Sequence, residues 1–151
     1  MIISTPQSLH FLKILGTCFY QDASKGVFKW SRKSGRTSSF LTGPSTDHTK
    51  GNSYGYYVYV EASVGNNYDL ATFNSPTIKQ AASTCSMTFW YHMYGTSIGE
   101  LTVYVQQGYR LTNLWSIYGD QGLDFLPLKD LEYLIRLCYQ RYPLLRRSSL
   151  S

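Results

Sequence analysis

The feature that most constrains the fold is the run FWYHMYG at residues 89–95, in which Phe, Trp, Tyr and His follow one another directly. Aromatic side chains favour the pleated, half-buried surface of a β-sheet, so the run predicts a strand. It is followed by LTVYV at residues 101–105, an alternating segment. Such alternation is typical of a strand with one buried face and one face toward water. The two segments together predict a sheet in the middle of the chain.

Further segments have the same character and complete an all-β pattern. The expected strands are residues 56–62, 69–73, 86–94, 100–106 and 114–118, separated by turns rich in Gly, Asn and Pro. Short strands at nearly regular spacing, with no helical pattern among them, predict a jelly-roll β-sandwich. Residues 18–122 form this expected domain, and residues 1–17 precede it as a leader without a clear pattern.

After Gly122 the pattern changes, and we expect one short α-helix in the tail, residues 123–151. Apolar residues recur at helical spacing between Leu128 and Cys138. Pro127 would occupy the first turn, where proline is tolerated, and Pro143 lies beyond the expected end. The sequence therefore predicts a helical segment added to an all-β domain.

The composition indicates one globular domain. The 151 residues are 43% hydrophobic and only 15% charged, which excludes a disordered chain. The net charge of +5 comes from basic residues that gather at residues 25–36 and 136–147. Basic clusters attract nucleic acids, heparin-like glycans or anionic lipids, but no nucleic-acid-binding motif accompanies these. We therefore interpret the clusters as solvated surface and expect no nucleic-acid partner.

The three cysteines, Cys18, Cys85 and Cys138, match no zinc-binding spacing. An odd number implies a free thiol or a missing partner. No apolar stretch reaches the roughly 18 residues that a transmembrane helix requires. The apolar patch at residues 11–15 is short and contains Lys13, so it makes no convincing signal peptide.

The sequence carries no recognisable catalytic motif, and we predict that the chain is not an enzyme. It has no Gly-x-Ser-x-Gly motif and no paired catalytic carboxylates. Asp47 lies beside His48, but we interpret it as a structural residue. Together with Ser45 it is expected to hold the adjacent Gly-Pro loop by bonds from side chain to backbone. His92 shares a strand face with Trp90; a ligand or pH-switch role stays open, and a packing role is preferred.

The large aromatic residues divide into expected core residues and expected contact residues. The expected core residues are the tryptophans Trp30, Trp90 and Trp115. The candidate contacts with a protein partner lie on faces opposite the aliphatic residues and are Tyr57, Tyr59 and Tyr104. An alternative stays open, in which Trp and Tyr stack on sugar rings, because jelly rolls often bind carbohydrates.

Six blocks of sequence, in order and at matching spacing, resemble the MAM domain family. The resemblance covers residues 18–122, and Gln21 and Asp22 with Trp30 match ahead of the blocks. The run FWYHMYG lies within the fourth block. The blocks are TGPSTDHT (42–49), GYYVYVEAS (55–63), SP (75–76), CSMTFWYHMYGTSIG (85–99), LW (114–115) and GDQG (119–122).

The resemblance implies a jelly-roll sandwich from the extracellular part of a larger protein, membrane-anchored or secreted. Members of the family mediate adhesion, oligomerisation or partner binding, and the domain itself has no enzymatic activity. We therefore expect a protein partner, homophilic or not, and a location at the cell surface or outside the cell. Membrane association would come through the parent protein. Two alternatives are a carbohydrate-binding jelly roll and an accessory fragment of a secreted or membrane-bound protease.

This chain departs from the family pattern at both ends. Cys18 resembles the second cysteine of the family, but nothing upstream supplies the first. Cys85 resembles the third, whose usual partner lies near the C-terminal end of the domain, which the tail replaces here. A bond between Cys85 and Cys138 is not expected, because a helical cysteine need not meet the Cα separation of about 4.4–6.8 Å that a disulfide requires. We expect a truncated, incomplete sandwich that is poorly stable alone.

The chain also departs from the family at the metal site. The resemblance implies that some members bind calcium or sodium through acidic residues near the two ends of the domain. The acidic run expected before Trp30 is here KGVFK, residues 25–29, which is basic. Asp22 and Asp47 remain as weak candidates, whereas a hard cation requires about six oxygen ligands. We therefore expect no cofactor.

Overall fold

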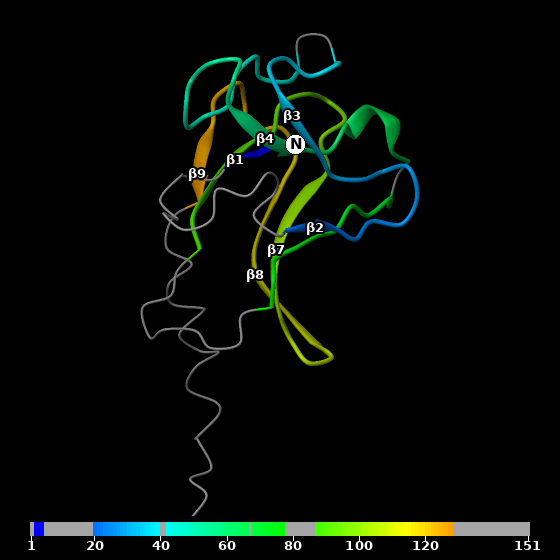
Figure 1. Cartoon of the computed structure of the whole chain (residues 1–151). Helices are drawn as coiled ribbons and strands as arrows, with labels where there is room; N and C mark the ends of the chain where they lie inside the picture. The colour runs from blue at the N-terminus through cyan, green and yellow to red at the C-terminus, as the bar shows by residue number, and fades with distance from the viewer. Residues whose placement is uncertain (1, 5–19, 40–41, 67, 78–86, 129–151) are drawn as a thin grey trace, which may run out of the picture.

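The computed structural model describes residues 2–4, 20–39, 42–66, 68–77 and 87–128 (Figure 1). In these ranges the regular structure is strand except for one short 3-10 turn, so the predicted all-β class is confirmed. The elements are β1 (Ile2–Ser4), β2 (Gln21–Asp22), β3 (Ser31–Ser34), β4 (Tyr56–Tyr59), η1 (Ala62–Val64), β5 (Phe73–Asn74), β6 (Phe89–His92), β7 (Glu100–Gln107), β8 (Arg110–Tyr118) and β9 (Leu126–Leu128).

β1 is the central strand of the larger sheet although it comes first in the chain. This sheet has five strands in the order β3-β4-β1-β6-β9, and every neighbouring pair is antiparallel. Ile2 pairs with Tyr59 on one side and with His92 on the other. Because β1 is antiparallel to both neighbours, β4 and β6 run parallel to each other on either side of it. Two further pairs of strands, β2-β5 and β7-β8, complete the described structure.

The β7–β8 hairpin contains the two longest of these strands and turns at Gly108 (Figure 1). Gly108 has a φ of 59°, and a positive φ at the first residue of a two-residue turn favours glycine. Leu101 and Val103 contact the core from β7. The pairing register shifts after Val103, where Leu114 is the extra residue on β8. This bulge lets both Leu114 and its neighbour Trp115 contact the core.

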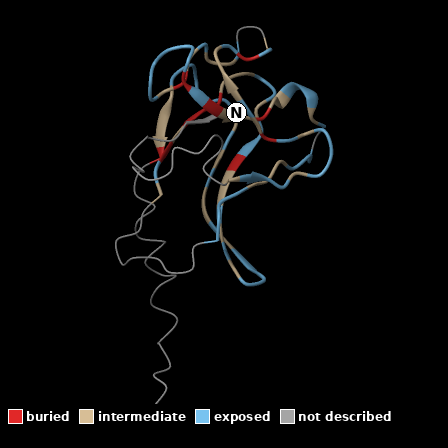
Figure 2. Cartoon of the chain, viewed as in Figure 1, coloured by how far each residue is buried: buried red, intermediate tan, exposed pale blue. Residues whose placement is uncertain are grey.

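The core lies between the larger sheet and this hairpin. Phe89, Tyr91 and Met93 alternate along β6 and its continuation and are almost wholly buried. The ring of Trp115 lies 5.4 Å from that of Tyr91 and 6.4 Å from that of Phe89. Figure 2 shows buried residues both in strands and in the loops beside them, and exposed residues toward the turn of the hairpin. The aromatic run thus forms β6, at the centre of the core.

The structure differs from the predicted elements mainly at their ends. Residues 126–128 form β9, so the prediction of a helix whose first turn contains Pro127 is wrong. Pairing with β6 brings Leu128 into the core, and proline is tolerated on an edge strand. The rest of the predicted helix, residues 129–151, lies outside the described residues. β4 ends at Tyr59, and a 3-10 turn at Ala62–Val64 replaces the end of the strand predicted there.

Candidate functional site

A loop covers the outer face of β6, which is the face opposite the main core. Trp90 and His92 extend from that outer face, because side chains alternate along a strand. The His48 ring stacks on Trp90, with the two centroids 3.7 Å apart. Phe125 completes the cluster, at 5.7 Å from His48 and 5.5 Å from His92. The aromatic run therefore contributes to two layers, one on each face of the sheet.

The three tryptophans occupy different environments. Trp30 is 8% exposed, and its indole nitrogen donates to the Ala71 carbonyl oxygen at 3.1 Å, so it lies in the core. Trp115 is partly buried against the same core. The assignment of Trp90 to the sandwich core is wrong, since this residue is partly buried on the outer face against His48.

The three candidate contact tyrosines do not form one surface. Tyr57 is 2% exposed, and its hydroxyl donates to the Gly35 carbonyl oxygen at 2.5 Å. Burial raises the pKa of Tyr57 to about 12. Its prediction as a partner contact is therefore wrong, because its side chain is enclosed within the chain. Tyr59 is half-buried and lines a groove, whereas Tyr104 is 54% exposed on β7.

Asp47 organises a turn in the covering loop. The residue is 3% exposed, and its Oδ2 accepts hydrogen bonds from the backbone nitrogens of Thr49 at 3.0 Å and Lys50 at 2.9 Å. A Cβ added at Gly55 would lie 1.7 Å from Asp47 Oδ1, so only glycine fits against this carboxylate. Asp47 is thus structural, but it holds the turn that follows it and not the preceding Gly-Pro loop.

Asp22 holds a second turn. Its Oδ1 accepts from the Ser24 hydroxyl at 2.5 Å and from the Trp30 backbone nitrogen at 3.1 Å. The Ser24 hydroxyl is the main reason that the pKa of Asp22 is lowered. Within the described ranges, no group of three or more His, Cys, Asp and Glu side chains could hold a metal ion. Among the described residues, neither Asp22 nor Asp47 therefore belongs to a group of side chains that could bind a metal ion.

Some predictions fall on residues that the structure does not describe. Cys18, Cys85 and Cys138 all lie outside the described ranges, so the expectation about disulfides stays a prediction. The same holds for the basic cluster at residues 136–147. Across the residues that are described, no helix is long and apolar enough to span a bilayer.

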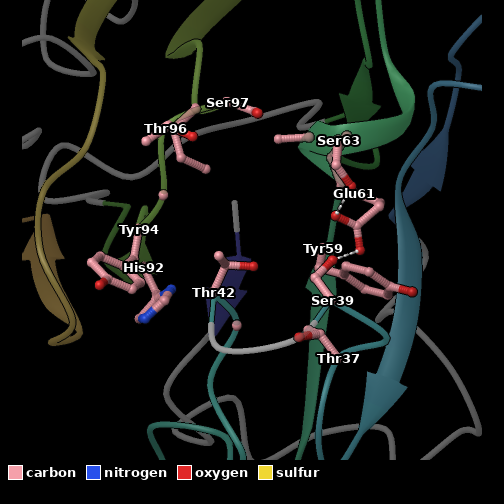
Figure 3. A pocket seen from close by; sticks show the side chains of 15 residues that line it. Thr37, Ser39, Thr42, Tyr59, Glu61, Ser63, His92, Tyr94, Thr96 and Ser97 are labelled. Atoms are coloured by element: carbon pink, nitrogen blue, oxygen red, sulfur yellow. Dashed lines mark hydrogen bonds between the residues drawn. The ribbon is translucent and has the colours of Figure 1, made fainter.

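A groove of about 330 Å³ opens between the end of β4 and the segment that follows β6 (Figure 3). Glu61 provides a carboxylate in its wall and accepts hydrogen bonds from the hydroxyls of Ser63 at 2.9 Å, Ser38 at 3.4 Å and Ser39. Burial opposes ionisation of Glu61, but these hydrogen bonds outweigh it and lower the pKa. The groove therefore presents an ionised carboxylate at neutral pH.

The rest of the groove is aromatic and rich in hydroxyl groups. Tyr59 and Tyr94 lie on its two sides, and Figure 3 shows them on either side of Thr42. His92 is 3% exposed, and burial lowers its pKa, so its imidazole is neutral at pH 7. The hydroxyls of the nearby serines Ser38, Ser39 and Ser63 donate to Glu61. The arrangement is suited to binding.

The sequence analysis missed this groove and the role of Glu61. The contact that builds its wall joins Glu61 to Ser39, which lies 22 residues earlier in the chain. The pattern around Glu61 indicates only a strand, and the serine-rich segment indicates only a loop. No periodic signal connects the two segments.

Comparison with known proteins identifies relatives of most of this chain. The model of the MAM domain (meprin/A5/mu) matches residues 13–126. Thyroid hormone-induced protein B of Xenopus laevis is 39% identical over 100 residues, which cover 64% of this chain and 14% of that protein. MAM domain-containing protein 2 of Homo sapiens is 33% identical over 111 residues, covering 72% of this chain and 16% of that protein. MAM domain-containing glycosylphosphatidylinositol anchor protein 1 of Homo sapiens is 34% identical over 113 residues, covering 70% and 12%.

The chain spans only 12% to 16% of the length of these relatives. No solved structure matches it. The matched range includes β2 to β8, and therefore the aromatic strand, the hairpin and both sides of the groove. Because the family model covers more than half of the 151 residues, the chain belongs to the MAM domain family.

Proposed function

We propose that this chain is a non-enzymatic, MAM-type module for protein interaction and adhesion, in the extracellular part of a larger membrane-associated or secreted protein. Family membership over residues 13–126 supports the proposal. One relative carries a glycosylphosphatidylinositol anchor in its name, which supports a place at the cell surface. The partner is a protein, and a second copy of the chain is one candidate.

The observation that carries the proposal is the solvent face of the β7–β8 hairpin. Tyr104, Leu111 and Tyr118, called here the hairpin face, are 54%, 62% and 75% exposed. Leu111 pairs with Gln106 and Tyr118 pairs with Glu100, so all three residues share the side of the hairpin that points away from the core. Tyrosine is enriched in protein interfaces because its ring buries a large area while its hydroxyl stays hydrogen-bonded.

Adhesion by beads coated with the purified chain tests this proposal. The measured quantities are bead clustering and bead attachment to intact cells. Changing Tyr104, Leu111 and Tyr118 together to Ser should weaken attachment by about ten-fold or more, since truncated interface aromatics often cost more than 1.4 kcal/mol. The matched control changes Tyr54, Tyr68 and Leu70 to Ser; these are two tyrosines and one leucine that are also exposed but are not part of the hairpin.

The two variants separate the outcomes. The proposal predicts that the hairpin-face variant loses attachment and that the control variant keeps it, with equal melting temperatures. Equal attachment by both variants would exclude the hairpin face as the contact surface. Absence of any saturable attachment by the wild-type chain would count against an adhesion module.

A further inference from the structure

The groove lies on the line of strand β1. β1 runs antiparallel to β4 and β6, and its pairing begins at Ile2, opposite Tyr59 and His92. If a strand continued β1 backwards in the same register, its residue two positions before Ile2 would lie opposite Glu61 on the β4 side. The same residue would lie opposite Tyr94 on the β6 side. Both residues line the groove. The groove is therefore the continuation of a strand position between two parallel chain segments (Figure 3).

The backbone beside this position faces the groove. The Met93 carbonyl oxygen accepts from the Gln121 nitrogen at 2.7 Å, on the β9 side of the segment. Backbone groups of successive residues in an extended segment point to alternate sides. The backbone groups of His92 and Tyr94 therefore point toward the line of β1. An incoming strand can hydrogen-bond to them in the same way as β1 does.

The groove also has a charge preference. A side chain opposite Glu61 and Tyr94 would share their face of the sheet, with Cβ atoms about 4.5–5.5 Å away. The Glu61 carboxylate is ionised, and no Lys or Arg is among the described residues that line the groove. A lysine at this place would bring its ammonium group to the carboxylate and its apolar stem to the Tyr94 ring.

We propose that the groove is a strand-acceptor site. It binds an extended segment of a protein partner that replaces β1 between β4 and β6 and places a basic side chain opposite Glu61. β1 itself shows the binding mode, because Ile2 and Ile3 pair with β4 and β6 at once and Ser4 pairs with β6. The inference rests on the proposed function as an interaction module and specifies one chemistry for the partner.

The probe is a fluorescent peptide, TKVIIST, with blocked ends. Its IIS segment takes the register of Ile2–Ser4, and its lysine then lies opposite Glu61. Binding to the whole chain is followed by fluorescence polarisation. The Ile3→Pro variant removes a backbone donor from the middle of β1, so it should bind the peptide more tightly than the wild-type chain does.

Three controls test the register and the charge. The peptide TEVIIST places like charges together, and Glu61→Gln removes the carboxylate charge; each should weaken binding about two- to five-fold, as expected for one cross-strand ion pair. The peptide TKVPIST should not bind, because proline interrupts the ladder. Glu100→Gln removes a carboxylate on β7 that does not line the groove, so this variant should bind TKVIIST as the wild-type chain does.

Other outcomes overturn the inference. One is that TKVIIST binds neither the wild-type chain nor the Ile3→Pro variant. Another is that the affinity changes neither with the charge of the peptide nor with the Glu61→Gln substitution. Displacement of the peptide by glucose, galactose or N-acetylglucosamine would reassign the groove to a carbohydrate. Coated beads that still attach to cells while the peptide fails would refute the strand site and leave the adhesion proposal standing.

Discussion

Replacing Tyr57 by phenylalanine removes one hydroxyl from a side chain that is 2% exposed. This hydroxyl donates to the Gly35 carbonyl oxygen at 2.5 Å and so ties β4 to the loop that follows β3. At neutral pH the Tyr57→Phe variant loses the hydrogen bond and leaves the partly buried Gly35 carbonyl oxygen without this donor. We expect it to be about 1–2 kcal/mol less stable than the wild-type chain.

The difference should shrink at high pH. Burial raises the pKa of Tyr57 from 10.0 to about 12, so the folded chain holds the phenolic proton more tightly than the unfolded chain. The corresponding stability is complete below about pH 10 and is lost as the pH rises through the folded pKa of about 12. The full shift corresponds to about 2.7 kcal/mol, which solvent screening reduces to about 1–2 kcal/mol. Phenylalanine has no such loss.

Urea unfolding at pH 7 and pH 11.5, with reductant present, measures both effects. The Tyr57→Phe variant should be less stable than wild type at pH 7 and nearly equal to it at pH 11.5. Tyr104→Phe is the matched control, because Tyr104 is 54% exposed and should match wild type at both pH values. A difference for Tyr57→Phe that stays constant with pH, or that Tyr104→Phe reproduces, would refute the reasoning.

Two further predictions concern packing and are read from thermal or urea unfolding. Gly55→Ala should lower the free energy of unfolding by about 2 kcal/mol or more, because the added Cβ would lie 1.7 Å from the buried Asp47 carboxylate. Gly99→Ala should leave the free energy of unfolding unchanged, because nothing lies within 4 Å of its added Cβ. Equal losses of stability in the two variants would contradict the packing described here. Phe89→Ala should cost about 3–5 kcal/mol because the side chain is 1% exposed. Leu111→Ala, at 62% exposure, should cost less than about 0.5 kcal/mol, and a similar cost for both would place the core elsewhere.

The parts of the fold that follow from local pattern could be predicted. The aromatic run and the alternating segment after it became β6 and β7, and Leu101 and Val103 contact the core as their alternation requires. Both signals depend only on neighbouring residues in one strand. For that reason these two strands can be predicted without any knowledge of what packs against them.

The parts that depend on distant segments could not be predicted. Tyr57 alternates onto the face expected to meet solvent, but its hydroxyl donates a hydrogen bond to the carbonyl oxygen of Gly35, a loop residue 22 positions earlier in the chain. Pro127 fits a helical first turn by its spacing, yet pairing of its segment with β6 makes a strand. β1 has only three residues, too few to show periodicity, and still occupies the centre of the sheet.

The central claim is that this MAM domain binds a protein partner through the hairpin face. The most direct measurement is a saturation binding curve of the labelled chain on intact cells, compared with the variant in which Tyr104, Leu111 and Tyr118 are Ser. The account predicts saturable binding by the wild-type chain and a loss of about ten-fold or more in the folded variant. Saturable binding that is unchanged in the variant would contradict it.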